Sequence, residues 1–198
     1  GSLQLAQGLD AGWCGHVAYY DSVSARPGSP ATVFQTRRPL VFAHRGGAAL
    51  APENTVIAFE GGLSHHADGM ELDVHLSRDG VPVVVHDATV DRTTNGTGAV
   101  ASFSAAELAA LDAGFRFDPA RGFPFRERGH GVPTLEEVLK RWPAARVIVE
   151  MKDGTAALGA AAVAVVRRVD AQSRVCLGSF QQEALDAELA YFREHPEH

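Results

Sequence analysis

From residue 39 onward, short runs of apolar, β-branched residues alternate with stretches in which apolar residues recur every three to four positions. The runs predict strands at residues 39–46, 70–76, 81–87, 145–152 and 174–180. The stretches predict helices at residues 52–67, 102–114, 132–142, 155–169 and from residue 182. Because strand and helix alternate, we expect an α/β fold with a parallel sheet and helical crossovers.

Local signals mark several helix starts. Ser104 and Glu107 have the spacing of a capping box, and Thr134 and Glu137 repeat that spacing before the next predicted helix. The helix predicted over residues 52–67 opens with a proline, which a first helical turn tolerates. These signals predict helix boundaries that do not depend on hydrophobic period alone.

Polar side chains gather where the predicted strands end, although the strands are apolar through most of their length. In a (β/α)8 TIM barrel the carboxyl ends of the strands build the active site, so this pattern favours such a barrel. The residues at these ends are His44, Arg45, Glu71, Asp73, His75, His86, Asp87, Glu150 and Lys152.

The expected barrel is incomplete at the C-terminus in this sequence. A (β/α)8 barrel usually has about 250 residues, whereas residues 39–198 hold five predicted strands. We therefore expect one domain over residues 39–198, with about five of the eight strands of a barrel. Residues 1–38 are rich in Gly, Ser, Pro and aromatic residues without a sustained period, which predicts an irregular N-terminal extension.

Alternation along the strand at residues 70–76 places Glu71, Asp73 and His75 on one face. The same rule places Glu150 on the polar face of its own strand. Three converging carboxylates repel one another, and a divalent cation removes that repulsion. Oxygen ligands favour Ca²⁺ or Mg²⁺ over zinc. The alternative is that Glu71 and Asp73 form salt bridges or face solvent from an edge strand.

Two histidines near these strand ends, His44 and His86, allow proton transfer near neutral pH. The alternative is that both are structural histidines with satisfied hydrogen bonds. His75 lies one step further along its strand than the carboxylates, so it is either a further ligand or a supporting residue.

The composition limits the function classes. The formal net charge is −6 and no basic block is present, so we expect no nucleic-acid partner. No apolar run is long enough for a transmembrane segment, and the start lacks a signal-peptide pattern. We expect a cytoplasmic location, with secretion after signal removal as the alternative. Cys14 and Cys176 are expected to be unpaired thiols, and nothing in the pattern indicates an oligomeric state.

The combined motifs resemble those of the glycerophosphodiester phosphodiesterase family. The resemblance runs from about residue 40 to about residue 180 and does not include the extension. It implies a (β/α)8 barrel, a role in lipid and glycerol metabolism, and hydrolysis of glycerophosphodiesters to an alcohol and sn-glycerol 3-phosphate with a bound divalent cation. The motifs are "HRGGAALAPENTVIAF", "ADGMELDVHLSRDGVPVVVHDATVDRTTNGTG", "VPTLEEVL" and "VIVEMK".

The resemblance also implies residue roles, carried over position by position. They are His44 and His86 as catalytic histidines; Glu71, Asp73 and Glu150 as metal ligands; Arg45 and Lys152 at the substrate phosphate; and Glu53 and His75 as supporting residues near the site.

Other interpretations remain open. One is a phospholipase D-like activity on lysophospholipids or sphingolipids, and another is a noncatalytic module that binds a metal or phosphate. Residues 112–131, rich in Phe and Arg, predict either a lid that recognises the headgroup or a surface excursion held by its aromatic side chains.

Overall fold

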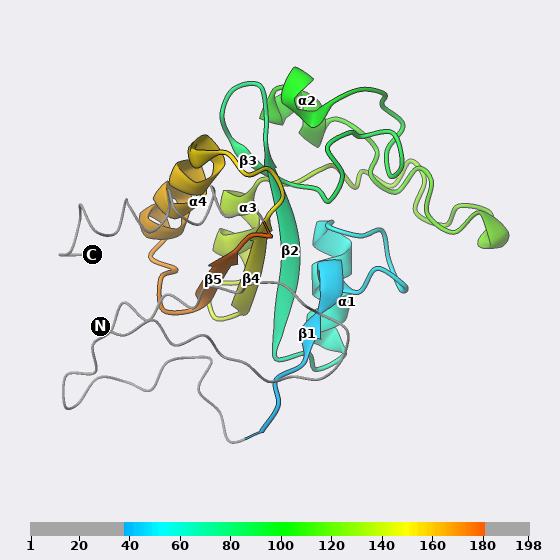
Figure 1. Ribbon diagram of the computed structural model, residues 1–198. Coiled ribbons are helices and arrows are strands. Elements are labelled where there is room, and N and C mark those ends of the chain that lie inside the picture. Colours follow the sequence, from blue (N-terminus) through cyan, green and yellow to red (C-terminus); the bar gives the residue numbers. More distant parts are fainter. Residues whose placement is uncertain (1–37, 181–198) are drawn as a thin grey trace, which may run out of the picture.

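The structure is a computed structural model that describes residues 38–180. The N-terminal extension expected over residues 1–38, except for its last residue, lies outside the described residues, as does the helix expected from residue 182. The described part is an α/β arrangement in which helices cover a twisted sheet (Figure 1).

Five strands form one sheet, and four of them run parallel in the order β1-β2-β4-β5. The fifth, β3, pairs with β2 in the antiparallel direction. The strands are β1 (Phe42–Ala43), β2 (Gly69–Leu76), β3 (Pro82–Val84), β4 (Arg146–Met151) and β5 (Val175–Gly178).

β3 departs from the expected parallel sheet with helical crossovers. Ser77 N donates to Val81 O at 3.0 Å, which closes a tight turn between β2 and β3. A connection this short makes a hairpin, because a parallel partner needs a crossover of a dozen or more residues. The strand is also shorter than the predicted 81–87, so His86 lies in the loop that follows it.

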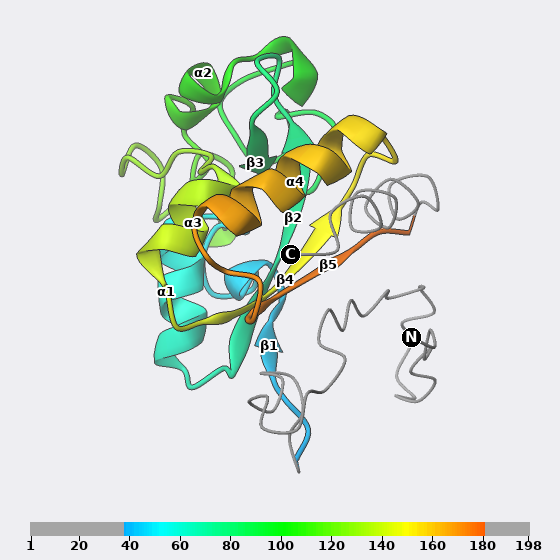
Figure 2. The same ribbon diagram turned by 90° about the vertical axis from the view of Figure 1, so that its left-hand side faces the viewer.

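Three helices cover one face of the sheet (Figure 2), and a fourth short helix lies among the loops beyond the carboxyl end of β2 (Figure 1). The two predicted capping boxes, at residues 104–107 and 134–137, are both present. The helices are α1 (Val56–Ser64), α2 (Ala105–Ala109), α3 (Leu135–Arg141) and α4 (Ala156–Arg168), and the 3₁₀ turns are η1 (His44–Gly46), η2 (Val100–Ser102) and η3 (Pro119–Arg121).

The segment between β1 and α1 differs from its prediction at both ends. The predicted strand 39–46 stops at Ala43, and the predicted helix 52–67 begins only at Val56, after the N-cap Thr55. Between them the chain turns sharply, because Arg45 and Asn54 both adopt left-handed backbone conformations, with φ of 51° and 58°. Gly46 lets this turn pack against α1, since a Cβ there would lie 2.7 Å from the backbone nitrogen of Phe59.

Alternation along β2 divides its side chains between two environments. Met70, Leu72 and Val74 pack under the helices and are fully buried, together with the corresponding residues of β4. Glu71 and Asp73 take the opposite face, as the sequence predicts. The core therefore fixes where the acidic side chains point.

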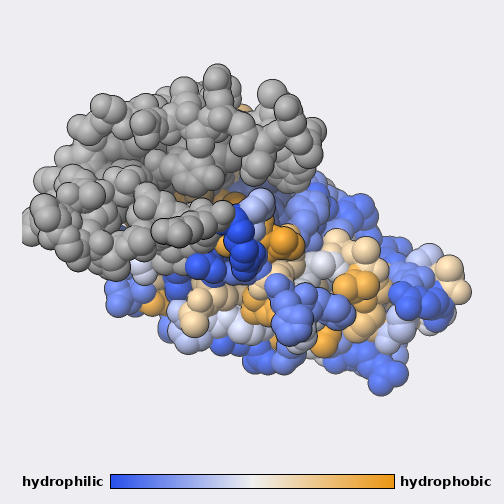
Figure 3. Space-filling view, turned by 90° about the horizontal axis from the view of Figure 1, so that it is seen from below, coloured by the Kyte–Doolittle hydropathy of each residue, from blue (hydrophilic) through white to orange (hydrophobic). Residues whose placement is uncertain are grey.

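One face of the described part, where it is visible, is mixed in polarity. Seen from the end where the strands begin, hydrophobic residues alternate with hydrophilic ones (Figure 3). Within residues 38–180, no helix combines the length and the apolar character needed to cross a membrane.

Leu72 provides a test of this core. Leu72→Ala removes a side chain that is 0% exposed, so we expect the free energy of unfolding to fall by about 2–5 kcal/mol. The matched control is Leu50→Ala, because Leu50 is 58% exposed and should change stability little. Urea unfolding measures both, and equal effects would contradict the assigned core.

Candidate active site

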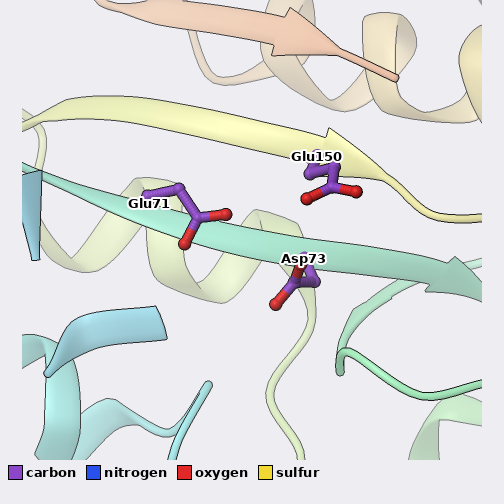
Figure 4. Close-up of side chains that lie close together, drawn as sticks. All are labelled: Glu71, Asp73 and Glu150. Carbon is purple, nitrogen blue, oxygen red and sulfur yellow. The ribbon is translucent and has the colours of Figure 1, made fainter. Parts of the chain in front are cut away.

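Three carboxylates meet on one face of β2 and β4 (Figure 4). One carboxylate oxygen from each of Glu71, Asp73 and Glu150 lies within 4.8 Å of the other two. The parallel register explains this meeting, because it sets Asp73 directly opposite Glu150, with Glu71 two positions earlier on β2. The convergence predicted from alternation is therefore present.

The cluster carries more negative charge than its surroundings neutralise. Burial raises the pKa of Glu71 to about 7, and the charges of Asp73 and Glu150 add to the rise. Glu71 Oε1 and Asp73 Oδ1 are buried and have no hydrogen-bond partner. Buried, unsatisfied carboxylate oxygens are the donors that a hard divalent cation takes, so the residues present fit such an ion.

Two basic side chains reach the cluster without removing its excess charge. Lys152 Nζ lies 2.7 Å from Glu150 Oε1 and 3.4 Å from Asp73 Oδ1. Arg45 Nε lies 3.4 Å from Asp73 Oδ2. Salt bridges, the alternative interpretation of the acidic pair, are thus present beside the candidate metal site.

Asn54, which the sequence analysis missed, holds Asp73 in place. Its Nδ2 donates to Asp73 Oδ2 at 2.8 Å, and its Oδ1 accepts from the backbone N–H of Asp73 at 3.3 Å. Asparagine tolerates the left-handed conformation that this position requires. This preference for a turn is a local signal for Asn54 in the sequence, but it does not indicate that the side chain contacts Asp73.

His44 and Arg45 follow β1 and contact the cluster from its edge. His44 Nε2 lies 3.9 Å from Glu71 Oε2, and the Arg45 backbone N–H donates to the same oxygen at 2.9 Å. Burial lowers the pKa of His44, and the charge of Arg45 lowers it further. The Arg45 guanidinium also donates to Glu53 Oε1 at 3.0 Å.

His86 approaches from the opposite direction. The Val85 backbone N–H donates to Asp73 O at 3.0 Å, which continues the pairing of β3 back along β2 and brings His86 beside the cluster. The His86 ring donates through Nδ1 to Asp87 Oδ1 at 2.7 Å. The backbone that carries His86 therefore lies beside Asp73, whereas the His44 ring itself approaches Glu71.

His75 lies on the same face of β2 as the carboxylates, but its ring contacts the loop that carries His86. Its Nε2 donates to the backbone oxygen of His86 at 3.1 Å. Its Nδ1 lies 3.8 Å from Asp153, a residue that the sequence analysis did not single out. His75 is not part of the group of potential ligands found among the described residues.

Residues 112–131 form an arm that projects beside the carboxyl ends of the strands (Figure 1). Its aromatic residues pack on one another, with the Phe117 and Phe125 rings 5.3 Å apart in an edge-to-face contact. Arg126 stacks over the Phe123 ring at 3.7 Å. These contacts hold the arm together through its own aromatic side chains, and they leave both of its interpretations open. Elsewhere, Cys176 is a buried thiol, and Cys14 lies outside the described residues.

Comparisons with known proteins point to one family. A model of the glycerophosphoryl diester phosphodiesterase family matches residues 44–193. A glycerophosphodiester phosphodiesterase from Caldanaerobacter subterraneus is 50% identical over 103 residues, which cover 52% of this chain and 40% of that protein. The chain thus spans less than half the length of this curated relative.

Solved structures show the same similarity. A glycerophosphodiester phosphodiesterase from Agrobacterium tumefaciens has a TM-score of 0.67 and 38% identity, covering 76% of this chain and 62% of the other. A phosphodiesterase from Oleispira antarctica, in complex with the product sn-glycerol 3-phosphate, has a TM-score of 0.68 and 32% identity, covering 79% and 63%.

These neighbours are TIM-barrel proteins, which confirms the expected fold class, and the described strands form an open part of that barrel. The family match extends over most of the sequence and includes every candidate site residue. The chain belongs to the glycerophosphoryl diester phosphodiesterase family.

Proposed function

We propose that this chain hydrolyses glycerophosphodiesters to an alcohol and sn-glycerol 3-phosphate, using a carboxylate-bound divalent cation and two histidines as general acid and base. The observation that carries the proposal is the convergence of the Glu71, Asp73 and Glu150 carboxylates. The His44 ring lies against Glu71, and the backbone just before His86 pairs with Asp73. The product complex of the Oleispira phosphodiesterase supports the choice of substrate class.

The carboxylate oxygens of Glu71, Asp73 and Glu150 would hold the cation, which we assign as Ca²⁺ or Mg²⁺. When bound, such an ion neutralises phosphate charge and polarises a phosphoryl oxygen. Asn54 keeps the Asp73 carboxylate oriented for this role by its two contacts.

Arg45 and Lys152 are suited to the substrate phosphate. Arg45 presents a planar fork that fits two phosphate oxygens, whereas Lys152 acts as a point charge. Both already lie against the carboxylate cluster, so a phosphate bound there meets positive charge from two sides. Glu53 accepts from Arg45 and holds its guanidinium near the site.

The histidines move protons during phosphoryl transfer. The 2-hydroxyl of glycerol lies beside the phosphorus, so its oxygen can attack once a histidine takes its proton. The P–O bond to the alcohol then breaks, and the second histidine protonates the departing oxygen. Water opens the resulting cyclic phosphate to sn-glycerol 3-phosphate. The lowered pKa of His44 keeps its ring neutral near pH 7, which suits the base.

A second candidate substrate is a lysophospholipid, cleaved in a phospholipase D-like reaction. The arm at residues 112–131 favours it, because its phenylalanines are only partly buried. The arm begins at the site, since Ala113 lines a small cavity together with Glu53 and His86. We propose that this arm contacts the headgroup or acyl chain of the substrate.

We also propose that residues 39–198 form one catalytic domain.

Product analysis tests the reaction itself. The full chain is incubated with glycerophosphocholine, glycerophosphoethanolamine and lysophosphatidylcholine, with Ca²⁺ or Mg²⁺ and then with chelator, and products are followed by phosphorus NMR. We expect sn-glycerol 3-phosphate from the water-soluble diesters, and chelator should stop its release. Turnover of the lysolipid alone would select the second candidate. Metal or phosphate binding without any turnover would favour a noncatalytic module.

Substitution of either histidine tests the acid-base assignment. His44→Ala and His86→Ala should each lower kcat by about 100-fold or more, as loss of general acid-base catalysis usually does. His65→Ala is the matched control, because His65 is exposed at the end of α1 and should leave kcat unchanged. Near-normal turnover in both site variants would remove the histidines from the mechanism.

Calorimetry tests the ligand set without any turnover. Glu71→Gln should weaken Ca²⁺ or Mg²⁺ binding by at least about tenfold, whereas Glu60→Gln, on the exposed side of α1, should not. Because the pKa of Glu71 is raised to about 7, a proton competes with the cation below that pH. Wild-type affinity should therefore be weaker at pH 6 than at pH 8, and Glu71→Gln should flatten this dependence. Equal affinities of variant and wild type would exclude Glu71 as a ligand.

A further inference from the structure

His86 is the last member of a chain of hydrogen-bonded side chains that runs from Arg45 through Glu53, Arg92 and Asp87. Its ring donates through Nδ1 to Asp87, and Asp87 in turn accepts from Arg92. Arg92 Nε donates to Asp87 Oδ2 at 2.6 Å, and its Nη2 donates to Asp87 Oδ1 at 3.1 Å. The carboxylate of Asp87 is therefore held at both oxygens.

The same guanidinium binds a second carboxylate, that of Glu53. Arg92 Nη2 donates to Glu53 Oε1 at 2.6 Å, and Nη1 donates to Glu53 Oε2 at 2.9 Å. Glu53 also accepts from Arg45, which touches Asp73. One planar side chain thus forms two forked contacts, a geometry that lysine does not offer.

These contacts join two segments that reach the cluster independently. Glu53 belongs to the turn after β1, which also carries His44 and Arg45. Asp87 belongs to the loop after β3, which carries His86. The strands hold neither loop against the other, so Arg92 is a direct link between the two histidine-bearing loops.

The charges needed for this link are present at neutral pH. The hydrogen bonds of the Arg92 guanidinium lower the pKa of Asp87 to about 2, against the opposing effect of burial. Burial alone would raise the pKa of Glu53, but the hydrogen bonds and charges of Arg92 and Arg45 outweigh it and lower that pKa. Both carboxylates are therefore ionised when the histidines work.

A contribution to folding stability does not explain the ion-pair network of Arg92, Asp87 and Glu53. The Arg92 side chain is 48% exposed, and ion pairs that exposed usually add little to folding free energy. The paired hydrogen bonds of the Arg92 guanidinium instead fix the orientation of the Asp87 and Glu53 carboxylates, because neither carboxylate can rotate without breaking them. In a neutral imidazole, a donor at Nδ1 leaves Nε2 as the nitrogen that exchanges protons.

We infer that Asp87 and Arg92 are positioning residues of this site: Asp87 fixes the tautomer and orientation of the His86 ring through Nδ1, and Arg92 fixes Asp87 relative to Glu53. The kinetic part of this inference rests on the proposed function. The structural part concerns the His86 ring alone and is measurable without substrate.

Kinetics on the full chain test the first part. Asp87→Ala should lower kcat by about 100-fold and Arg92→Gln by about tenfold, with KM changed by less than about twofold. Arg92→Lys should fall between Arg92→Gln and wild type, because it restores charge without the two forks. The matched control is Arg168→Gln on α4, which breaks a similar exposed pair with Glu136 and should leave kcat unchanged. Unchanged kcat in both Asp87→Ala and Arg92→Gln would overturn the inference.

Folding effects are separated by melting temperature and by metal binding. Arg92→Gln should shift the melting temperature by less than about 4 °C, as expected for loss of an exposed pair. Metal affinity measured by calorimetry should match wild type, since no candidate ligand is altered. Asp87→Asn keeps the shape and removes the charge, so it replaces Asp87→Ala if the alanine variant fails to fold, and a lowered kcat is expected there too.

Nitrogen NMR tests the second part whether or not the chain turns over substrate. Long-range ¹H–¹⁵N correlation on the ¹⁵N-histidine-labelled full chain should show neutral His86 protonated at Nδ1. Asp87→Ala should move the proton toward Nε2, and Arg168→Gln should not. An unchanged tautomer in Asp87→Ala would overturn the positioning role, whereas absence of turnover in wild type would overturn only the proposed function.

Discussion

Mutual repulsion among three converging carboxylates, two of them buried, is the constraint on which the rest of this site depends. The parallel register of β2 and β4 forces Asp73 and Glu150 together and leaves Glu71 on the same face. In a poorly solvated place, ionised neighbours are unfavourable, and the pKa of Glu71 is raised accordingly to about 7. The polar groups around the trio act against this repulsion: Arg45 and Lys152 bring charge, and Asn54 brings hydrogen bonds. Even so, Glu71 Oε1 and Asp73 Oδ1 are buried without a hydrogen bond, so a bound cation would stabilise their negative charge.

The hairpin between β2 and β3 explains how two histidines reach this trio. β4 occupies one edge of β2 along most of its length, so β1 and β3 share the other edge. They run toward each other, and the residues that follow them meet near Glu71 and Asp73. The one departure from a parallel sheet is thus the feature that completes the candidate active site.

Much of this arrangement was predictable because it follows from short-range periodicity. Alternation alone assigns Glu71 and Asp73 to one face, and the register of neighbouring parallel strands then adds Glu150. The orientation of β3 had a usable signal in the short turn before it, which is too brief for a crossover. Asn54 and Arg92 had none of comparable strength. Asp73 lies 19 residues from Asn54, and Glu53 lies 39 residues from Arg92. Contacts at such separations leave no mark on a hydrophobic period.

The turn between β1 and α1 adopts unfavourable backbone conformations that position the site residues. Arg45 and Asn54 both occupy the left-handed region. Asparagine tolerates this region better than arginine does, but strain there persists only where surrounding contacts overdetermine it. Those contacts are visible: the Asn54 backbone N–H donates to Arg45 O at 3.0 Å, and the close packing of Gly46 on Phe59 fixes the turn against α1. The strained residues are the ones that direct a backbone N–H to Glu71 and a side-chain amide to Asp73. The acidic cluster is therefore positioned by a rigid turn with stored backbone strain, and the network through Glu53 and Arg92 extends that rigidity to the loop that carries His86.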